Sequence, residues 1–150
     1  AYIPAMHMPM RFTSTKEFKY DRNDNTGVNT SPDSVFSGGQ ELKSEAFLLA
    51  WDPVQQKERW RVKMKVVDFN GGILSTAGNV VFQGTTDGYF VVYRADTGEK
   101  LKEIKTGVGI MAAPSTYSID DEQFVTVIIT LTSACATFTL NGLCNICTCF

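Results

Sequence analysis

The residues best suited to redox or metal chemistry are four cysteines near the C-terminal end, two of which form the C-x-x-C spacing Cys144 to Cys147. Covalent haem attachment by this spacing needs a histidine at the next position, which is Thr148. A zinc site needs a second pair of ligands, for which Cys135 and Cys149 are poorly spaced. A redox-active pair is expected ahead of a helix in an α/β context, which is not the pattern here. Two interpretations stay open: a non-native tail produced by a frameshift, an intron read through or an assembly error, or an ordinary apolar strand with incidental thiols.

The single histidine and a run of oxygen-donor side chains are weaker candidates for a metal-binding or catalytic site. His7 has no partner nearby in the sequence, so it predicts a structural or surface role rather than metal binding or nucleophilic catalysis. Asp21, Asn23, Asp24 and Asn25 carry oxygen donors of the kind that calcium prefers. Because the run lacks the spaced acidic pattern that ends in glutamate, a solvated turn is favoured over a calcium loop.

Composition and charge narrow the class of protein. Hydrophobic residues make up 43% of the 150 residues and charged residues 20%, which is ordinary for a globular domain. A formal net charge of −2 and a pI near 5.4 leave no basic surface for a phosphate backbone, so we expect no nucleic-acid partner. We also expect no membrane span. The first residues, AYIPAMHMPMRF, do not have the pattern of a signal peptide, so any export signal is expected upstream.

The centre of the chain predicts a small antiparallel sheet. Three short β-rich runs, Val80–Gln83, Tyr89–Tyr93 and Leu101–Ile104, show no helical period. Asp87-Gly88 and Asp96-Thr97-Gly98 supply the turns between them, since glycine adopts the positive φ that a tight hairpin requires. Both faces of the middle run are largely apolar, so we expect it to be covered on both sides.

This unit recurs along the chain. Phe47–Trp60 aligns with Tyr89–Lys102 at an offset of 42 positions, and Val80–Gln83 aligns with Phe124–Val127 at an offset of 44. The spacing is typical of β-propeller blades, which have four strands and about 40–50 residues each. The fold class predicted is therefore all-β, a partial propeller, and three blades cannot close a ring. The alternative is a chance match between β-rich segments.

Three strings also resemble a known family. They are AWDPVQQKERW (50–60), NGGILSTAGNVVFQGTTDGYFVVYRADTGEKL (70–101) and TGVGIMAAPSTYSIDDEQFVTV (106–127). Together they resemble the C-terminal part of the pyrroloquinoline-quinone (PQQ)-dependent alcohol dehydrogenases, over roughly residues 1–127. The resemblance implies a periplasmic propeller of eight blades that oxidises small alcohols with PQQ and calcium, and passes electrons to cytochrome c or a quinone.

The resemblance also implies roles for particular residues. The family segment like Asn70-Gly71-Gly72 reaches the ring centre, so Asn70 and Gly71 are candidate cofactor contacts; alternatively the two glycines only make a tight entry into a strand. Trp60 stands where the family docks a tryptophan on the next blade, whereas its counterpart Lys102 replaces the usual tryptophan. The family's catalytic aspartate, calcium ligands and vicinal disulfide belong to earlier blades and have no matching motif here, so no catalytic or metal residue is assigned.

The resulting organisation has two parts. Residues 1–129 form the partial quinoprotein propeller, with a polar excursion over 13–40 that reads as a long loop, and residues 130–150 form the divergent cysteine-containing tail. Within the propeller, 61–66 alternates basic and apolar residues and predicts a half-exposed strand. We expect the isolated chain to be inactive. The alternative function is a non-catalytic propeller that binds partners, as in outer-membrane assembly lipoproteins.

Overall fold

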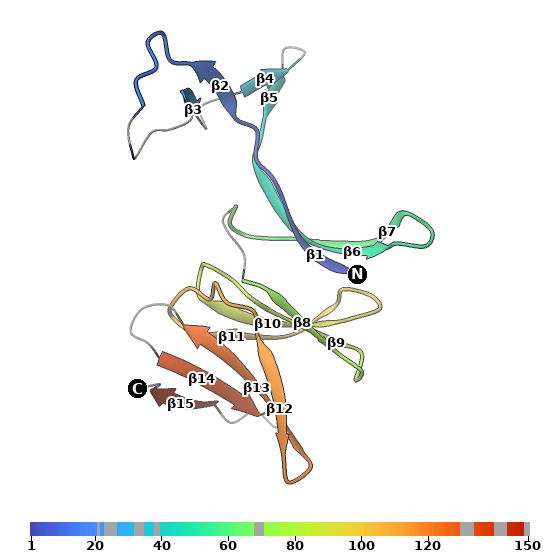
Figure 1. The fold of residues 1–150 in the computed structure, drawn as a ribbon. Helices are drawn as coiled ribbons and strands as arrows, with labels where there is room; N and C mark the ends of the chain where they lie inside the picture. The colour runs from blue at the N-terminus through green and yellow to red at the C-terminus, as the bar shows by residue number, and fades with distance from the viewer. Residues whose placement is uncertain are drawn as a thin grey trace.

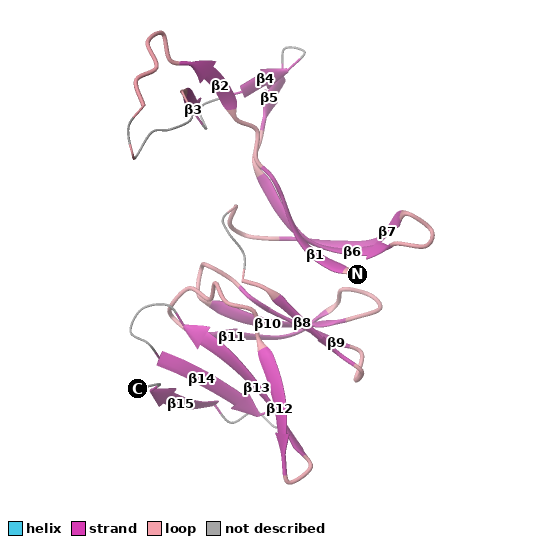
Figure 2. Cartoon of the chain, viewed as in Figure 1, coloured by secondary structure: helices cyan, strands magenta, loops and turns pink. Residues whose placement is uncertain are grey.

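The computed structural model describes residues 1–20, 22, 27–31, 35–37, 40–67, 71–129, 134–139 and 144–148. All regular structure in these ranges is β-strand, as Figure 2 shows. No helix in the described part of the chain is long and apolar enough to cross a membrane.

Three antiparallel sheets follow one another along the chain and lie one above the next (Figure 1). The first sheet has the order β1 (Tyr2–His7), β6 (Glu45–Asp52), β7 (Lys57–Lys63). The second sheet has the order β11 (Lys100–Lys105), β10 (Tyr89–Arg94), β9 (Val80–Gly84), β8 (Ile73–Thr76). The third sheet has the order β12 (Ser115–Ile119), β13 (Glu122–Ile129), β14 (Ala134–Thr139), β15 (Cys144–Thr148). The described part of the 130–150 tail thus supplies two strands of the third sheet.

The 42-residue repeat is present in the backbone as well as in the sequence. The β6–β7 pair has a register irregularity between Ala50 and Trp51, and the β10–β11 pair has one between Val92 and Tyr93. These two sites are 42 positions apart, as are the aligned segments. A bulge bends its strand and increases the local twist. The matching positions therefore give the two hairpins the same shape, and the predicted repeat is confirmed.

The turns of the second sheet follow the predicted chemistry, and a turn of the third sheet also has positive φ. Gly88 and Gly98 have φ of 83° and 75°, values that glycine adopts without the steric cost other residues meet. Asp120 and Asp121, between β12 and β13, both have positive φ, at 50° and 62°. Two successive left-handed residues are typical of a type I′ hairpin turn, and Asp tolerates this conformation better than most side chains.

Two expectations about strands need correction. The half-exposed strand predicted over 61–66 is β7, Lys57–Lys63, because pairing with β6 begins at the Asp52–Lys57 turn and ends near the start of β6. The alternation itself is right: Arg61, Lys63 and Lys65 are exposed, whereas Met64 is buried.

The polar excursion over 13–40 is not simply a loop. It includes most of a hairpin of β2 (Arg11–Ser14) with β3 (Val28–Ser31) and a hairpin of β4 (Val35–Ser37) with β5 (Gln40–Leu42). Both lie away from the stacked sheets in Figure 1. Backbone pairing in an exposed hairpin needs no apolar alternation, so the hydrophobic pattern did not reveal it. The candidate calcium-loop residues Asp21, Asn23, Asp24 and Asn25 lie outside the described residues.

Two apolar cores separate the three sheets, and the second sheet contributes to both. The first core, between the first and second sheets, contains Leu48, Val81, Val91 and Tyr93 among its buried residues. The second core lies between the second and third sheets, and its buried members among the described residues are Phe82, Phe90, Ile110, Val125 and Val127. Residues one apart along β9 and β10 therefore belong to different cores. The expectation that this sheet is covered on both faces is confirmed.

Candidate functional site

Two crossover segments link the sheets and lie against each other. Residues 64–72 run from β7 to β8, and residues 106–114 run from β11 to β12, so each joins the last strand of one sheet to the first strand of the next. A Cβ atom on Gly71 would lie 2.8 Å from the carbonyl oxygen of Ile110 and 3.0 Å from that of Gly84. A Cβ atom on Gly72 would overlap Ala113. The two glycines therefore permit a main-chain contact that other residues would block.

The second crossover is fixed to the hairpin of β9 and β10. The N–H of Ile110 donates to the carbonyl oxygen of Thr85 at 2.9 Å, and the N–H of Thr106 donates to that of Gly88 at 2.9 Å. Ile110 is fully buried in the second core. A Cβ atom on Gly109 would lie 2.7 Å from the carbonyl oxygen of Thr86. Backbone hydrogen bonds and close packing thus hold this segment against the end of the second sheet.

The two predicted cofactor contacts have different outcomes. Asn70 lies outside the described residues, as does Phe69 before it. Gly71 is buried, and the space beside it is filled by backbone of the chain's own second crossover. This geometry supports tight packing as a role for Gly71. Contact of Asn70 and Gly71 with a cofactor stays a prediction.

Gln83 is a feature that the sequence reasoning missed. Its side chain is fully buried, and neither its amide oxygen nor its amide nitrogen has a hydrogen-bond partner among the described residues. It lies two residues from Val81 of the first core, so the two share a face of β9. A buried amide without a partner is costly, by about 1–3 kcal/mol. The only signal in the sequence was one polar residue inside the apolar run VVFQG.

Trp60 provides the contact between sheets that the resemblance implied. A Cβ atom on Gly98 would lie 2.6 Å from the six-membered ring of Trp60, so the indole lies directly on the glycine backbone. The indole N–H donates to the carbonyl oxygen of Ala95 at 3.0 Å, and the hydroxyl of Tyr2 donates to the same oxygen at 2.9 Å. The rings of Tyr2 and Trp60 are 5.7 Å apart. The docking predicted for Trp60 is confirmed.

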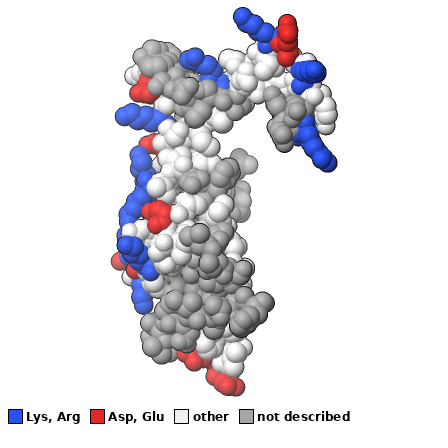
Figure 3. Space-filling model, turned by 90° about the vertical axis from the view of Figure 1, so that its left-hand side faces the viewer, with Lys and Arg blue, Asp and Glu red and all other residues white. Residues whose placement is uncertain are grey.

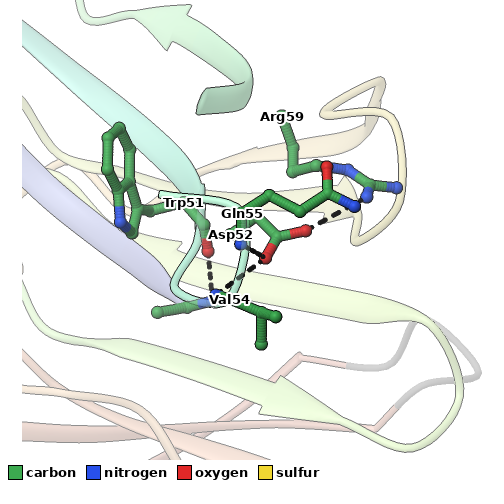
Figure 4. Close-up of polar contacts among 6 residues, drawn as sticks. Trp51, Asp52, Val54, Gln55 and Arg59 are labelled. Atoms are coloured by element: carbon green, nitrogen blue, oxygen red, sulfur yellow. Dashed lines mark hydrogen bonds and ion pairs between the residues drawn. The ribbon is translucent and has the colours of Figure 1, made fainter. Parts of the chain in front are cut away.

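The turn that precedes Trp60 is held by one carboxylate (Figure 4). Asp52 Oδ1 accepts the backbone N–H groups of Val54 and Gln55, both at 3.0 Å, and Oδ2 lies 3.4 Å from a guanidinium nitrogen of Arg59. The hydrogen bond from the Gln55 N–H is the largest of the effects that lower the pKa of Asp52 below its ordinary value. This carboxylate shapes the β6–β7 hairpin.

A small cavity lies between β7 and the second sheet. Its volume is about 120 Å³, and its lining includes Met64, Tyr89 and Tyr93. Burial, assisted by the negative charges of Glu103 and Asp87, raises the pKa of Tyr93 to about 12. The phenol therefore stays neutral at physiological pH and has no role there as a base.

Lys and Arg side chains gather along one side of the stacked sheets (Figure 3). Several are paired with carboxylates: Arg61 with Glu58, Lys63 with Glu45, and both Lys65 and Lys100 with Glu103, the latter at 2.8 Å. These pairs are exposed, and pairs of this kind contribute little to stability. They also reduce the positive charge on this side of the molecule.

The described residues offer no clustered set of metal ligands. No three His, Cys, Asp or Glu side chains within the described ranges gather closely enough to hold a metal ion. On the side where a Cβ atom would project, Gly71 faces backbone oxygens and Gly72 faces Ala113. We therefore derive no catalytic step from this part of the chain.

Successive blade-like antiparallel sheets joined by crossovers define a partial β-propeller. The family model for the PQQ glucose/ethanol/alcohol dehydrogenase β-propeller domain matches residues 43–125, which is more than half of the chain. The chain belongs to this family.

Similarity to individual proteins agrees with this family membership. The quinohemoprotein alcohol dehydrogenase of Comamonas testosteroni is 46% identical over 136 residues, covering 85% of this chain and 19% of the relative. The quinohemoprotein alcohol dehydrogenase ADH-IIG of Pseudomonas putida is 54% identical over 91 residues, covering 61% of this chain and 12% of that relative. The crystal structure of the Comamonas testosteroni enzyme superimposes with a TM-score of 0.79 at 38% identity, covering 95% of this chain and 24% of that one. The chain thus spans less than a quarter of the length of these relatives.

Proposed function

We propose that this chain is the C-terminal part of a quinoprotein alcohol dehydrogenase that oxidises alcohols with PQQ and calcium. Membership of the PQQ propeller family supports the proposal, as does similarity to several dehydrogenases, among them the 1-butanol dehydrogenase (cytochrome c) of Thauera butanivorans at 39% identity over 141 residues. The main structural support for the proposal is the pair of crossovers. The family match spans both of them, and Gly71 and Gly72 allow them to lie in close contact.

In this proposal the chain supplies structure and the cofactor supplies the chemistry. When bound in the parent, PQQ would supply the redox chemistry as the acceptor of two electrons from the alcohol. Residues 64–72 and 106–114 form part of the wall of the pocket, with Asn70 and Gly71 bordering the quinone. The calcium ligands and the general base lie in the part of the parent that precedes these residues, and electrons leave to a cytochrome c or a quinone acceptor in the periplasm. The isolated chain is inactive.

A chimera tests this proposal. Residues 43–125 replace the matching segment of the Comamonas testosteroni quinohemoprotein alcohol dehydrogenase, and PQQ binding is followed by absorbance beside alcohol-dependent dye reduction. We expect the chimera to bind PQQ and to oxidise alcohols, while the purified 150-residue chain with added PQQ and calcium does not. A chimera that folds without binding PQQ would favour the alternative, a non-catalytic propeller scaffold.

Substitutions in the chimera separate cofactor contact from packing. Asn70→Ala is expected to weaken PQQ binding without changing the unfolding temperature of the cofactor-free chimera. Gly71→Ala is expected to lower that temperature, because its Cβ meets backbone oxygens. Gly78→Ala is the matched control, since the nearest atom to its Cβ is Thr76 Oγ1 at 3.8 Å. Equal effects of Gly71→Ala and Gly78→Ala would contradict the close approach of the crossovers.

A further inference from the structure

Strand pairing in the third sheet places two cysteines opposite each other. In the antiparallel β14–β15 pair, Cys135 is the register partner of Cys147. Directly opposite residues of antiparallel strands have Cα atoms about 4.5–5.5 Å apart. Disulfides join Cα atoms about 4.4–6.8 Å apart, so this register is compatible with a bond between the two residues.

The same register disfavours the pairing that the C-x-x-C spacing suggests. Cys144 and Cys147 both lie in β15. Three residues of extended strand separate their Cα atoms by about 10 Å, beyond the roughly 7 Å that a disulfide spans. Cys144 is instead the register partner of Phe138. Among the three cysteines in described strands, pairing thus selects Cys135 and Cys147.

The position of β15 gives a bond there a structural consequence. β15 is the last strand in the order of the third sheet, and its one neighbour in that sheet is β14. An edge strand has backbone groups unpaired along one side and is easily displaced. A covalent link to β14 would hold β15 in register and restrict the unfolded chain across the connection between the two strands.

We propose that Cys135 and Cys147 form a reversible disulfide that fastens β15 to β14, with a low-molecular-weight disulfide such as oxidised glutathione as the oxidant. The thiolate of one cysteine attacks a sulfur of oxidised glutathione, which gives a mixed disulfide and releases one glutathione thiol. The thiolate of the other cysteine then attacks the protein sulfur of that mixed disulfide and releases the second glutathione. Two protein thiols are oxidised, and one glutathione disulfide is reduced to two thiols.

Peptide mapping of the full 150-residue chain tests the pairing. The reduced protein is equilibrated with oxidised glutathione, its free thiols are alkylated, and it is digested with chymotrypsin without reduction. Trypsin is unsuitable because no Lys or Arg follows Lys105. Cleavage after Leu131, Phe138 and Leu143 separates the peptide TSACATF from CNICTCF. We expect these two peptides to be joined through Cys147, with Cys144 and Cys149 alkylated. Linkage through Cys144 or Cys149, a mixture, or no linkage would overturn the proposal.

Two double variants provide a quantitative comparison, because each leaves one pair of thiols. Cys144→Ser with Cys149→Ser leaves Cys135 and Cys147, whereas Cys147→Ser with Cys149→Ser leaves Cys135 and Cys144. In native buffer the equilibrium constant for disulfide formation with glutathione is expected to be higher for the first variant, by roughly tenfold or more, which is about 30 mV for a two-electron couple. In denaturant the two constants are expected to be similar. Similar constants in native buffer would overturn the proposal.

Discussion

The two interfaces between neighbouring sheets are built differently, although the sheets repeat. The first interface joins the first and second sheets. In it Trp60 lies on Gly98, and the carbonyl oxygen of Ala95 accepts one hydrogen bond from Trp60 and one from Tyr2. In the second interface the position equivalent to Trp60 is Lys102, which is exposed. There the contact depends on the second core, in which the rings of Phe82 and Phe90 are 5.8 Å apart and nearly parallel. Both interfaces have a buried core, but only the first has a tryptophan docked beside that core, because Lys102 stands at the equivalent position of the second.

The largest effect is expected from the second core. Phe90→Ala is expected to reduce the free energy of unfolding by about 3–5 kcal/mol, because a buried ring is removed from a packed core. Urea unfolding followed by fluorescence measures the change. Phe12→Ala is the control, since Phe12 is 67% exposed and its loss is expected to have little effect. Equal losses for the two variants would show that the second interface does not depend on this core.

A pair of glycines with the same backbone conformation isolates the contribution of Trp60. Gly98 and Gly107 both have φ of 75°, but a Cβ atom meets Trp60 at Gly98, whereas at Gly107 it meets no atom of the described residues within 4 Å. Gly107→Ala is expected to cost about 1–2 kcal/mol from backbone strain alone. Gly98→Ala is expected to cost more in the same urea experiment.

The additional loss of unfolding free energy caused by Gly98→Ala relative to Gly107→Ala is expected to disappear in a Trp60→Ala background, to within about 0.5 kcal/mol. A double-mutant cycle with the four proteins measures it. An excess that persists without the indole would mean that Gly98 is required for another reason, and the contrast between the interfaces would lose its basis.

A substitution at Gln83, on the face of β9 toward the first interface, is expected to increase stability rather than reduce it. Gln83→Met has similar size and removes two buried polar atoms that have no partner in the described part of the chain. We expect an increase in the free energy of unfolding of about 1–2 kcal/mol. Thermal and urea unfolding both measure it. Destabilisation would show that the amide makes a hydrogen bond when the protein is in solution.

The smallest effect concerns the β6–β7 turn and depends on pH. The pKa of Asp52 is lowered in the folded chain, so its ionised form stabilises the fold above the unfolded pKa of about 4, and this contribution is lost as pH falls through the folded value. Asp52→Asn keeps an oxygen that can accept the backbone N–H groups but does not titrate in this range. The difference in unfolding temperature between the two proteins is expected to shrink as pH is lowered below about 4. If the difference in unfolding temperature stayed constant with pH, the ionised carboxylate of Asp52 would not be what stabilises the turn.

The sequence was most informative where one residue type determines the backbone. The runs at 80–83, 89–93 and 101–104 became β9, β10 and β11, because glycine turns and apolar alternation specify hairpins locally. The two hairpins that overlap 13–40 carried no such signal. The burial of Gln83 and the packing of Gly71 depend on segments far apart in the sequence, 110–113 in the case of Gly71. No local pattern encodes contacts of this kind, so they required the structure.

The glycine crossovers also bear on how many sheets a closed ring contains. Where 71–72 meets 110–113, only backbone and the methyl group of Ala113 separate the two segments, so the ends of the sheets that they join have little room to approach further. Side chains at the periphery, such as Trp60, set the separation of the outer ends. The wedge angle between consecutive sheets follows from these two thicknesses, and the full circle divided by that angle is the number of sheets. A methyl group at Gly71 would thicken the inner end and favour a ring of different size or an open stack.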